Sequence, residues 1–505
     1  MPIRKELSSF CLIVLLAAIL RFTGICFDSL WLDESYQSLV GAYGQALPDF
    51  TQSQKYLFRF EKVSTPPVML ANFRKVDPLC PPLYALFLNR WIYLFGSSDF
   101  VLRSLSALIS TISVAALMIF ARVLVGPKIA IWAGLLNAVS PFDIQYAQEA
   151  RMYSLVYLTS ILSAGSLLLI VKSELKTKKE ILLLPLYAIS TWAMVNSHYT
   201  ALFLAAAQGL CSAIYLVWRK NWRLLVLLVI AWVSTALLWI PWLGMFFQSA
   251  SSRKESFYVS RAADFVWPLK ALFLRIPINW LIFLSGQRVF AFAAPIYLSS
   301  AAMLSSAAYY ATRRQSENRN WILALWIWLL LPALGLWLID VLENHRVVEV
   351  ARYVIYTAPA AYILAAFGLD KLMSLKKAFA YLAASHFTFA AINLVYLHQV
   401  PQREPWREMA AFVEKLVAVD DTLLVSQHYD VVCLDRYLSK ARIQVGMSPA
   451  MGKTAVQQRL RGLKSFALLT AQDGESIKDL ILPEFQISKE VGLSHGLHLR
   501  LYTKE

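Results

Sequence analysis

The chain has 505 residues, of which 58% are hydrophobic and only 16% are charged. One soluble core cannot bury that much apolar surface, so the composition excludes an ordinary soluble protein and indicates a polytopic membrane protein. The net charge of +16 comes from short lysine and arginine clusters between apolar segments. This is the positive-inside pattern and does not indicate a nucleic-acid partner. The five cysteines have no paired spacing, and we interpret them as buried thiols.

Eleven apolar segments are predicted to cross the membrane as helices, the structure that lipid imposes on a spanning chain. We place them at residues 7–26, 100–122, 128–142, 152–171, 181–196, 199–217, 224–243, 289–310, 321–339, 353–369 and 378–397. The first has a basic start and no clear cleavage site after it, so we predict an uncleaved span.

The basic clusters give this count an orientation. Under it, all of them fall on one side of the membrane, which is therefore the cytoplasm. With the N-terminus in the cytoplasm, the odd number of spans places the C-terminal region outside. The predicted location is the plasma (inner) membrane. The clusters are Arg4/Lys5, Arg122/Lys128, Lys172/Lys176/Lys178/Lys179, Arg219/Lys220/Arg223, Arg313/Arg314/Arg319 and Lys371/Lys376/Lys377.

Two further apolar segments are interrupted by charge. Residues 81–96 contain Arg90, and residues 266–286 contain Lys270 and Arg275. Aromatic and basic anchors are typical of helices that lie at the membrane interface. We therefore predict interfacial helices here, the first of them in the first outer loop.

The region after residue 400 differs in character, because helix-like and strand-like patterns alternate along it. Helices are predicted at 406–417, 429–438 and 454–463, and strands at 422–426, 443–445, 465–470, 485–489 and 497–502. This alternation predicts a small α/β domain without a glycine-rich phosphate loop. The predicted domains are thus an all-α membrane domain at 1–400 and an extracytoplasmic α/β domain at 401–505.

Two groups of polar residues lie near span ends on the predicted outer side. Asp33 and Glu34 follow span one in an aromatic setting, where paired carboxylates can supply a general base and a metal or hydrogen-bond ligand. Alternatively, they simply begin an interfacial helix, where acids suit the dipole. Glu149 and Tyr153 share one helical face at the start of span four, with Arg151 offset from them. The alternative there is a surface pair of little energetic value.

Two other outer turns contain polar candidates. His198 lies in a tight turn between spans five and six, as an interfacial side chain or a neutral metal ligand. Arg346 and Arg352 lie where arginine is disfavoured, so they need a partner. Glu349 and the phosphate of a lipid-linked substrate are the two candidates. Arg21, near the outer end of span one, is either snorkelling or paired.

Together these residues resemble the C-type (GT-C) glycosyltransferases, specifically the dolichyl-phosphate-mannose protein mannosyltransferase and aminoarabinose transferase superfamily. The region after Trp406-Arg407 also resembles the short outer domain of some bacterial members. The matching pieces occur in the family's order: Arg21-Phe22; Leu30-Trp-Leu-Asp33-Glu34-Ser-Tyr36; Pro81-Pro-Leu-Tyr84 with Leu94-Phe-Gly96 and Arg103-Ser-Leu-Ser; Ser140-Pro-Phe through Gln148-Glu-Ala-Arg-Met-Tyr153; His198-Tyr-Thr-Ala-Leu-Phe203; and Arg352-Tyr353 with Pro359.

The resemblance implies a glycosyltransferase that moves a hexosyl or pentosyl unit from a polyprenyl-phosphate carrier to an acceptor on the extracytoplasmic face. It also implies inversion at the anomeric carbon. By position, Asp33 matches the family's catalytic acidic residue and would take the acceptor's proton, supported by Glu34. The acceptor class, whether protein, lipid or glycan, is left open, as is the sugar.

The resemblance assigns the remaining candidates to the donor. Glu149, with Arg151, matches the second outer motif, and His198 matches a position that in some relatives faces a divalent metal ion. Arg352 and Tyr353 match the motif near the lipid phosphate, and a phosphate leaving group needs arginines or a metal. The full set assigned to the donor phosphate is Arg151, Arg346, Arg352 and Tyr353, with Arg21 and Tyr153 as further site residues.

One departure and one rival function accompany this resemblance. The family often has histidine before Pro-Pro-Leu, whereas Cys80 stands there in this chain, which leaves the need for a metal open. A polytopic transporter of a lipid-linked or polar substrate is the alternative function, ahead of a non-catalytic scaffold. Carriers tend to have repeated halves and charges near the midplane, and this sequence has neither. The outer loops 45–79 and 247–279 are expected to shape the acceptor pocket.

Overall fold

The computed structural model describes residues 3–44, 54–56, 63–76, 80–178, 180–252, 266–286, 294–313, 318–418, 421–426, 430–439, 442–446, 457–458, 460–471 and 481–504. Its contacts divide the chain into two compact units. Unit 1 consists of Met1–Thr23, Pro78–Tyr84 and Arg103–Leu397. Unit 2 consists of Gly24–Asp77, Ala85–Leu102 and His398–Glu505.

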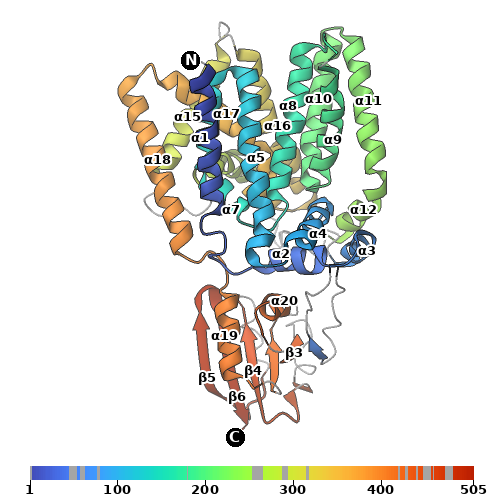
Figure 1. The fold of residues 1–505 in the computed structure, drawn as a ribbon, viewed down its shortest axis with the longest axis vertical. Helices are drawn as coiled ribbons and strands as arrows, with labels where there is room; N and C mark the ends of the chain where they lie inside the picture. Colours follow the sequence, from blue (N-terminus) through green and yellow to red (C-terminus); the bar gives the residue numbers. More distant parts are fainter. Residues whose placement is uncertain are drawn as a thin grey trace. The chain divides into compact units, whose positions relative to one another are not determined.

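Unit 1 is built from helices (Figure 1). The α-helices that lie wholly or mainly in it are α1 (Ile3–Phe22), α5 (Asp99–Val125), α6 (Pro127–Ala138), α7 (Pro141–Ala147), α8 (Tyr153–Ser173), α9 (Leu183–Val195), α10 (Leu202–Trp218), α11 (Trp222–Trp239), α12 (Leu243–Ser252), α13 (Trp267–Lys270), α14 (Ile276–Ser285), α15 (Ala294–Thr312), α16 (Arg319–Glu343), α17 (Ala358–Leu372) and α18 (Lys376–Gln399). Short 3-10 and π segments join them: η2 (Glu180–Leu182), η3 (Tyr199–Ala201), η4 (Ile240–Trp242), η6 (Ala271–Arg275), η7 (Val347–Glu349) and η8 (Ala351–Thr357).

The chain is a multi-pass membrane protein. Among the described residues, eight helical runs are long and apolar enough to cross a bilayer: Asp99–Val125, Tyr153–Ser173, Tyr199–Trp218, Trp222–Phe247, Trp267–Ser285, Arg319–Glu343, Ala351–Leu372 and Lys376–Gln399. Seven of these eight runs overlap spans predicted from the sequence. The predicted count of eleven is not confirmed, and α1 and α15 are helical without being among the eight.

The predicted span at 128–142 is divided in two. Helix α6 has 12 residues, or about 18 Å of length, which is short of the roughly 30 Å hydrocarbon core. It stops because Ser140 caps a new helix and Pro141 occupies that helix's first turn. At its other end, Gly126 has a φ of 106°, a conformation that favours glycine, so the chain turns there from α5 into α6.

Residues 267–285 also differ from the prediction. We expected an interfacial helix, but α13, η6 and α14 form one helical run that meets the length and composition of a span. Pro268 lies in the first turn of the run, where no backbone donor is required, and Pro277 lies just after the π segment η6, a local widening of the helix.

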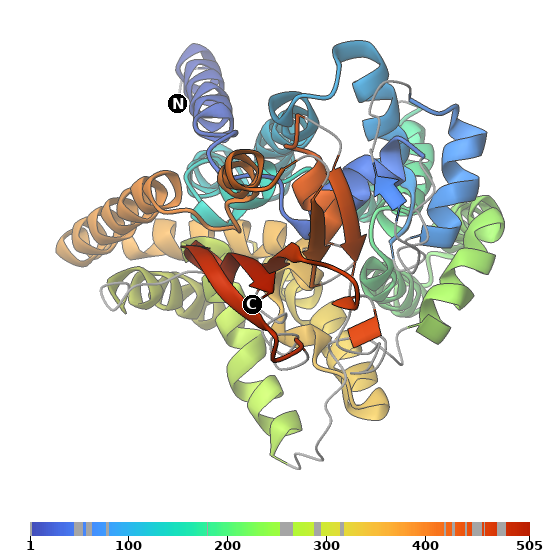
Figure 2. The same ribbon diagram turned by 90° about the horizontal axis from the view of Figure 1, so that it is seen from below.

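Helix α17 forms the centre of unit 1. Its run is 89% buried, whereas those of α11 and α18 are only 17% buried. It packs against α15, α6 and α16. Gly368 permits the closest of these contacts, because a Cβ there would overlap the carbonyl oxygen of Met303 on α15. Helices α8, α9 and α11 pack around a second core that includes Leu167, Tyr187 and Leu228. Figure 2, which looks along the helices, shows α18 at the periphery of the bundle.

Unit 2 combines the first loop with the C-terminal region. Its elements are α2 (Leu32–Ser35), η1 (Tyr36–Ala42), β1 (Gln54–Tyr56), α3 (Pro66–Val76), α4 (Leu83–Phe95), α19 (Trp406–Leu416), β2 (Thr422–Val425), α20 (Asp430–Asp435), β3 (Arg442–Gly446), β4 (Ser465–Thr470), β5 (Phe485–Leu493), η11 (Ser494–Gly496) and β6 (Leu497–Lys504). Helix α4 confirms the predicted helix at 81–96, while its place at the membrane interface stays a prediction. The Asn89 side chain on α4 donates to the carbonyl of Ala42, 2.7 Å away.

The predicted α/β character of the C-terminal region is confirmed by one six-stranded sheet of order β1-β3-β2-β4-β6-β5. Strand β2 runs parallel to β3 and β4, while β6 is antiparallel to β4 and β5. Phe466 and Tyr502 stack with ring centroids 4.8 Å apart in its core. Strand β1 was not predicted: it comes from the first loop and pairs antiparallel with β3. Of the helix predicted at 454–463, residues 454–456 and 459 lie outside the described residues, while residues 457, 458 and 460 are helical.

Candidate active site

The turn between α7 and α8 contains the second predicted motif. Ser140 caps α7 by accepting the Asp143 N–H, and α8 begins at Tyr153. Glu149 and Arg151 lie in the intervening turn, and both are buried. The Gln148 side chain holds this turn to the end of α1, because its Nε2 donates to the carbonyls of Arg21 and Thr23 at 3.2 and 2.7 Å.

Arg151 is a buried cation with defined neighbours. Only 6% of its surface is exposed. Its Nη2 lies 3.7 Å from the Cys80 sulfur, and its guanidinium lies 5.9 Å from the ring centre of Tyr153. Its own carbonyl accepts a 3.2 Å hydrogen bond from the Ser106 hydroxyl. Removing a guanidinium from water is costly, so this position suits the binding of an anion.

His198 connects the next two predicted positions. Its Nδ1 lies 2.7 Å from the Thr200 hydroxyl, which also lies 2.7 Å from the carbonyl of Tyr353. The imidazole ring is 6.2 Å from the ring of Tyr153 and 5.5 Å from that of Tyr353. Segments η3 and η8 are therefore joined through Thr200, which the sequence analysis did not single out.

Arg346 and Arg352, which are close together in the chain, each lie on an aromatic ring. The Arg352 guanidinium is 5.3 Å from the ring centre of Tyr353. The Arg346 guanidinium is 5.7 Å from the ring centre of Trp267. Glu349 was one proposed partner for these arginines; its Oε1 accepts a 2.8 Å hydrogen bond from the Trp267 indole and lies 3.8 Å from Arg275.

Unit 1 therefore brings together five residues from three predicted motifs. A continuous series of side-chain neighbours runs through Arg151, Tyr153, His198, Tyr353 and Arg352. Cationic groups backed by aromatic faces can bind an anionic group and keep the surroundings dry. The contact of Cys80 with Arg151 was missed, although the Cys-Pro-Pro departure marked the position.

Arg21 has a different setting. It is fully buried and donates to the Ser110 hydroxyl at 2.7 Å. It also donates to the carbonyls of Ala17, Asn137 and Ala138. Of the two alternatives for Arg21, the structure shows pairing within the protein.

Asp33 and Glu34 belong to unit 2. Both lie in α2, where Glu34 is fully buried and Asp33 is half-buried. The preceding Trp31 is covered by the Arg403 guanidinium, 3.7 Å from the ring centre. Acidic residues in a first helical turn suit its dipole, as the alternative interpretation requires.

A divalent metal ion would have to be bound by His, Cys, Asp or Glu side chains at the site. Within the part of the chain that the structure describes, no three His, Cys, Asp or Glu side chains gather at metal-binding distance. Zinc sites use three or four such ligands, whereas Mg²⁺ is commonly held by one or two carboxylates together with substrate phosphate oxygens. The described donors form no site of the zinc kind, and we derive no step of the reaction through a metal.

The fold and these residues define a polytopic membrane protein of the GT-C fold. The structure is similar to ArnT from Cupriavidus metallidurans, with a TM-score of 0.61, 13% identity and 97% of each chain covered. It is also similar to that ArnT bound to undecaprenyl phosphate, with a TM-score of 0.58, 12% identity and 97% of each chain covered.

A third similar structure is the oligosaccharyltransferase AglB from Archaeoglobus fulgidus, in complex with an inhibitory peptide and a dolichol-phosphate. Its TM-score is 0.57 at 12% identity, covering 100% of this chain and 75% of AglB. The dolichyl-phosphate-mannose-protein mannosyltransferase family matches at residues 80–243. No curated protein matches the chain. The fold implied by the resemblance is thereby confirmed over 97% of the chain, and the family model matches the chain in sequence at residues 80–243.

Proposed function

We propose that this protein transfers a sugar from a polyprenyl-phosphate carrier to an acceptor on the extracytoplasmic face. The acceptor's nucleophilic atom forms a bond to the anomeric carbon while the bond from that carbon to the phosphate oxygen breaks. Polyprenyl phosphate leaves with the electron pair, and Asp33 takes the acceptor's proton. Attack from the face opposite the leaving group inverts the anomeric carbon.

The donor phosphate is assigned to Arg151, Arg352 and Tyr353, with Arg346 further along the chain. The observation that carries this assignment is the series Arg151–Tyr153–His198–Tyr353–Arg352 within unit 1. Arginines held in a dry setting stabilise the negative charge that develops on a phosphate leaving group. Two similar structures, ArnT and AglB, contain undecaprenyl phosphate and a dolichol-phosphate. We place the same class of ligand here.

The proton acceptor is assigned to unit 2. Asp33 is half-buried, and the neighbouring Glu34 is fully buried beside it in α2. Glu34 supports Asp33 or the hydrogen bonds around it. Because the acceptor must reach Asp33, the C-terminal domain and the first loop are assigned to the extracytoplasmic side, and the N-terminus to the cytoplasm.

The decisive experiment uses the full chain in lipid nanodiscs. Polyprenyl-phosphate mannose and polyprenyl-phosphate aminoarabinose are supplied with extracted cell-envelope acceptors, and released polyprenyl phosphate is measured. We expect release with at least one donor and its loss in Asp33→Asn. Glu343→Gln, an exposed acid at the end of α16, is the matched control and should leave the rate unchanged. Wild-type turnover in Asp33→Asn would refute the assignment.

The proposed orientation has its own test. Alkaline phosphatase is active outside the cytoplasm, so a fusion after Glu505 should be active in intact cells. A fusion within the loop near Lys176 should be inactive. The opposite pattern would overturn the topology and the placement of Asp33 on the outer face.

A further inference from the structure

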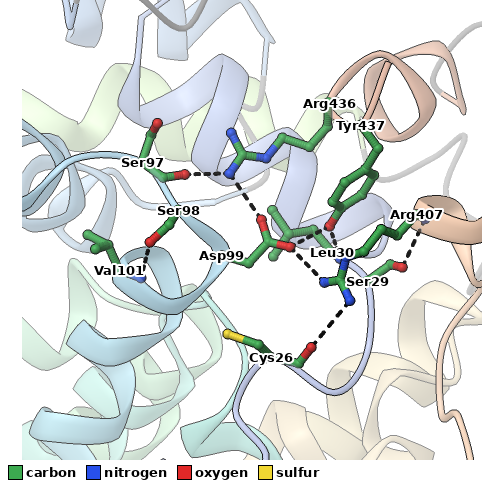
Figure 3. A network of polar contacts seen from close by, with 10 residues as sticks. All are labelled: Cys26, Ser29, Leu30, Ser97, Ser98, Asp99, Val101, Arg407, Arg436 and Tyr437. Atoms are coloured by element: carbon green, nitrogen blue, oxygen red, sulfur yellow. Dashed lines mark hydrogen bonds and ion pairs between the residues drawn. The ribbon is translucent and has the colours of Figure 1, made fainter. Parts of the chain in front are cut away.

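Asp99 lies at the centre of a polar network inside unit 2 (Figure 3). Its Oδ1 accepts from Arg436 at 3.0 Å, and its Oδ2 accepts from Arg407 at 3.0 Å and from the Tyr437 hydroxyl at 2.8 Å. Arg436 also donates to the carbonyl of Ser97. The Asp99 side chain is only 12% exposed. One carboxylate thus holds three side chains that are more than 300 residues away along the chain.

The same side chains hold the segment before α2. The Tyr437 hydroxyl accepts the Leu30 N–H at 2.8 Å, the Arg407 N–H donates to the Ser29 hydroxyl at 3.1 Å, and the Arg407 guanidinium reaches the Cys26 carbonyl at 3.5 Å. Burial, followed by the nearby Asp99 carboxylate, raises the pKa of Tyr437 well above its ordinary value. Tyr437 therefore stays protonated, and it donates to Asp99 while accepting from Leu30.

Helix α2 depends on such contacts for its position. It has four residues, and Trp31 at its N-terminus makes no side-chain capping bond. A helix this short has no stability of its own, so neighbouring structure must fix it. Leu30 is fully buried, and it precedes Asp33 by three residues. The Tyr437 hydroxyl thus anchors the backbone directly before the helix.

A second contact from the C-terminal region is made with α2 itself. Helix α20 packs against α2. Tyr437 follows two residues after α20 in the chain. Helix α2 and the segment before it are therefore both held by one short stretch of the C-terminal region.

We propose that Tyr437, together with Asp99 and its two arginines, is a set of positioning residues that fixes α2 so that the Asp33 carboxylate can accept the acceptor's proton. The C-terminal region would then serve the reaction through the backbone at Leu30, without touching the substrate. This inference rests on the proposed function only for the role of Asp33. The holding of Leu30 can be tested without any substrate.

The test uses Tyr437→Phe in the full chain. The variant removes only the hydroxyl and keeps the aromatic ring, whose centre lies 5.4 Å from the Arg407 guanidinium. Without it the buried Leu30 N–H lacks this acceptor, and a loss of ~1.4 kcal/mol makes its hydrogen exchange about tenfold faster. We expect that acceleration by mass spectrometry at the peptide containing Leu30. Glu490→Gln is the control, because it disrupts the Glu490–Arg500 pair between β5 and β6 and touches none of these residues.

Kinetics then test positioning. With the donor that the wild type uses, Tyr437→Phe should lower kcat about tenfold while the donor KM stays within about twofold. In an Asp33→Asn background, the same substitution should change the residual rate by less than about twofold, because the two changes act through one group. If Tyr437 had a merely structural role, its substitution would lower kcat by the same factor in the wild-type and Asp33→Asn backgrounds.

The outcomes separate this inference from the proposed function. Wild-type exchange at Leu30 in Tyr437→Phe overturns the inference, and so does an equal loss of kcat with and without Asp33. Full turnover in Asp33→Asn instead refutes the proposed function and, with it, the positioning of a base. In that case the exchange experiment alone decides whether Tyr437 holds the segment before α2.

Discussion

Replacing Arg21 by methionine should destabilise unit 1 strongly. The guanidinium is fully buried, and four hydrogen bonds, at 2.7 to 3.3 Å, join it to Ser110 and to three carbonyls. Asp143 is close enough to interact with it electrostatically. Removing one partner from such a buried set typically costs about 3–5 kcal/mol, because the remaining polar groups lose their compensation. We expect a loss of that size in the free energy of unfolding.

Removing the acidic partner as well should recover part of this loss. Asp143→Asn in the Arg21→Met background takes away the carboxylate left without its cation, and coupled buried groups commonly show about 0.5–3 kcal/mol of interaction energy. Arg219→Met, at an exposed position after α10, is the matched control. It should stay within about 0.5 kcal/mol of the wild type.

Unfolding by sodium dodecyl sulfate in mixed micelles, followed by tryptophan fluorescence, measures these differences. The reasoning fails if Arg21→Met loses less than about 1 kcal/mol, because a buried cation with four partners cannot be that cheap to remove. It also fails if the double variant is no more stable than Arg21→Met, because the charge of Asp143 would then have no part in the effect.

Three further predictions concern other parts of the chain. Gly368→Ala should destabilise the protein, because its Cβ overlaps the Met303 carbonyl, whereas Gly209→Ala, with open space around it, should be neutral or slightly stabilising in the same unfolding assay. Burial, then the nearby Asp430 carboxylate, raises the pKa of the Cys433 thiol well above its ordinary value, so iodoacetamide at pH 8 should spare Cys433 until the protein unfolds. Because the unfolded thiol ionises at a lower pH than the folded one, the contribution of Cys433 to stability is complete below about pH 9 and declines above it. Dialysis against EDTA tests the divalent ion that the resemblance implies: turnover that is lost and then restored by Mg²⁺ or Mn²⁺ would support that ion, and turnover unchanged by EDTA would exclude it.

The sequence predicted helices and strands well where the hydrophobic pattern within the segment itself determines them. Helix α19 and strands β2 and β4 lie within about a residue of their predicted bounds, because burial on one face gives each a clear period. The break between α6 and α7 was missed, although Ser140-Pro141 is a typical helix start. Strand β1 had no local signal, since three residues of the first loop became a strand only by pairing with β3.

The candidate site was predictable in part for the same reason. Arg151, Tyr153, His198, Arg352 and Tyr353 were found because each is an unusual polar or aromatic residue at a span end, and unit 1 brings them together. The Asp99 network was not predicted. Its members are separated by 308 to 338 residues, and nothing local distinguishes them from surface charges.

A buried charge at a span end is therefore an ambiguous functional signal, and its partners resolve it. Arg21 drew attention for the same reason as Arg151, yet four of its five N–H donors are used by Ser110 and by main-chain carbonyls of α1 and α6. A guanidinium so occupied has little capacity to bind a phosphate. Arg151 and Arg352 lie instead on tyrosine rings, within the series Arg151–Tyr153–His198–Tyr353–Arg352 that joins the motifs assigned to the donor. Donor phosphate binding should thus depend on Arg151 and Arg352, and the role of Arg21 should appear in stability alone.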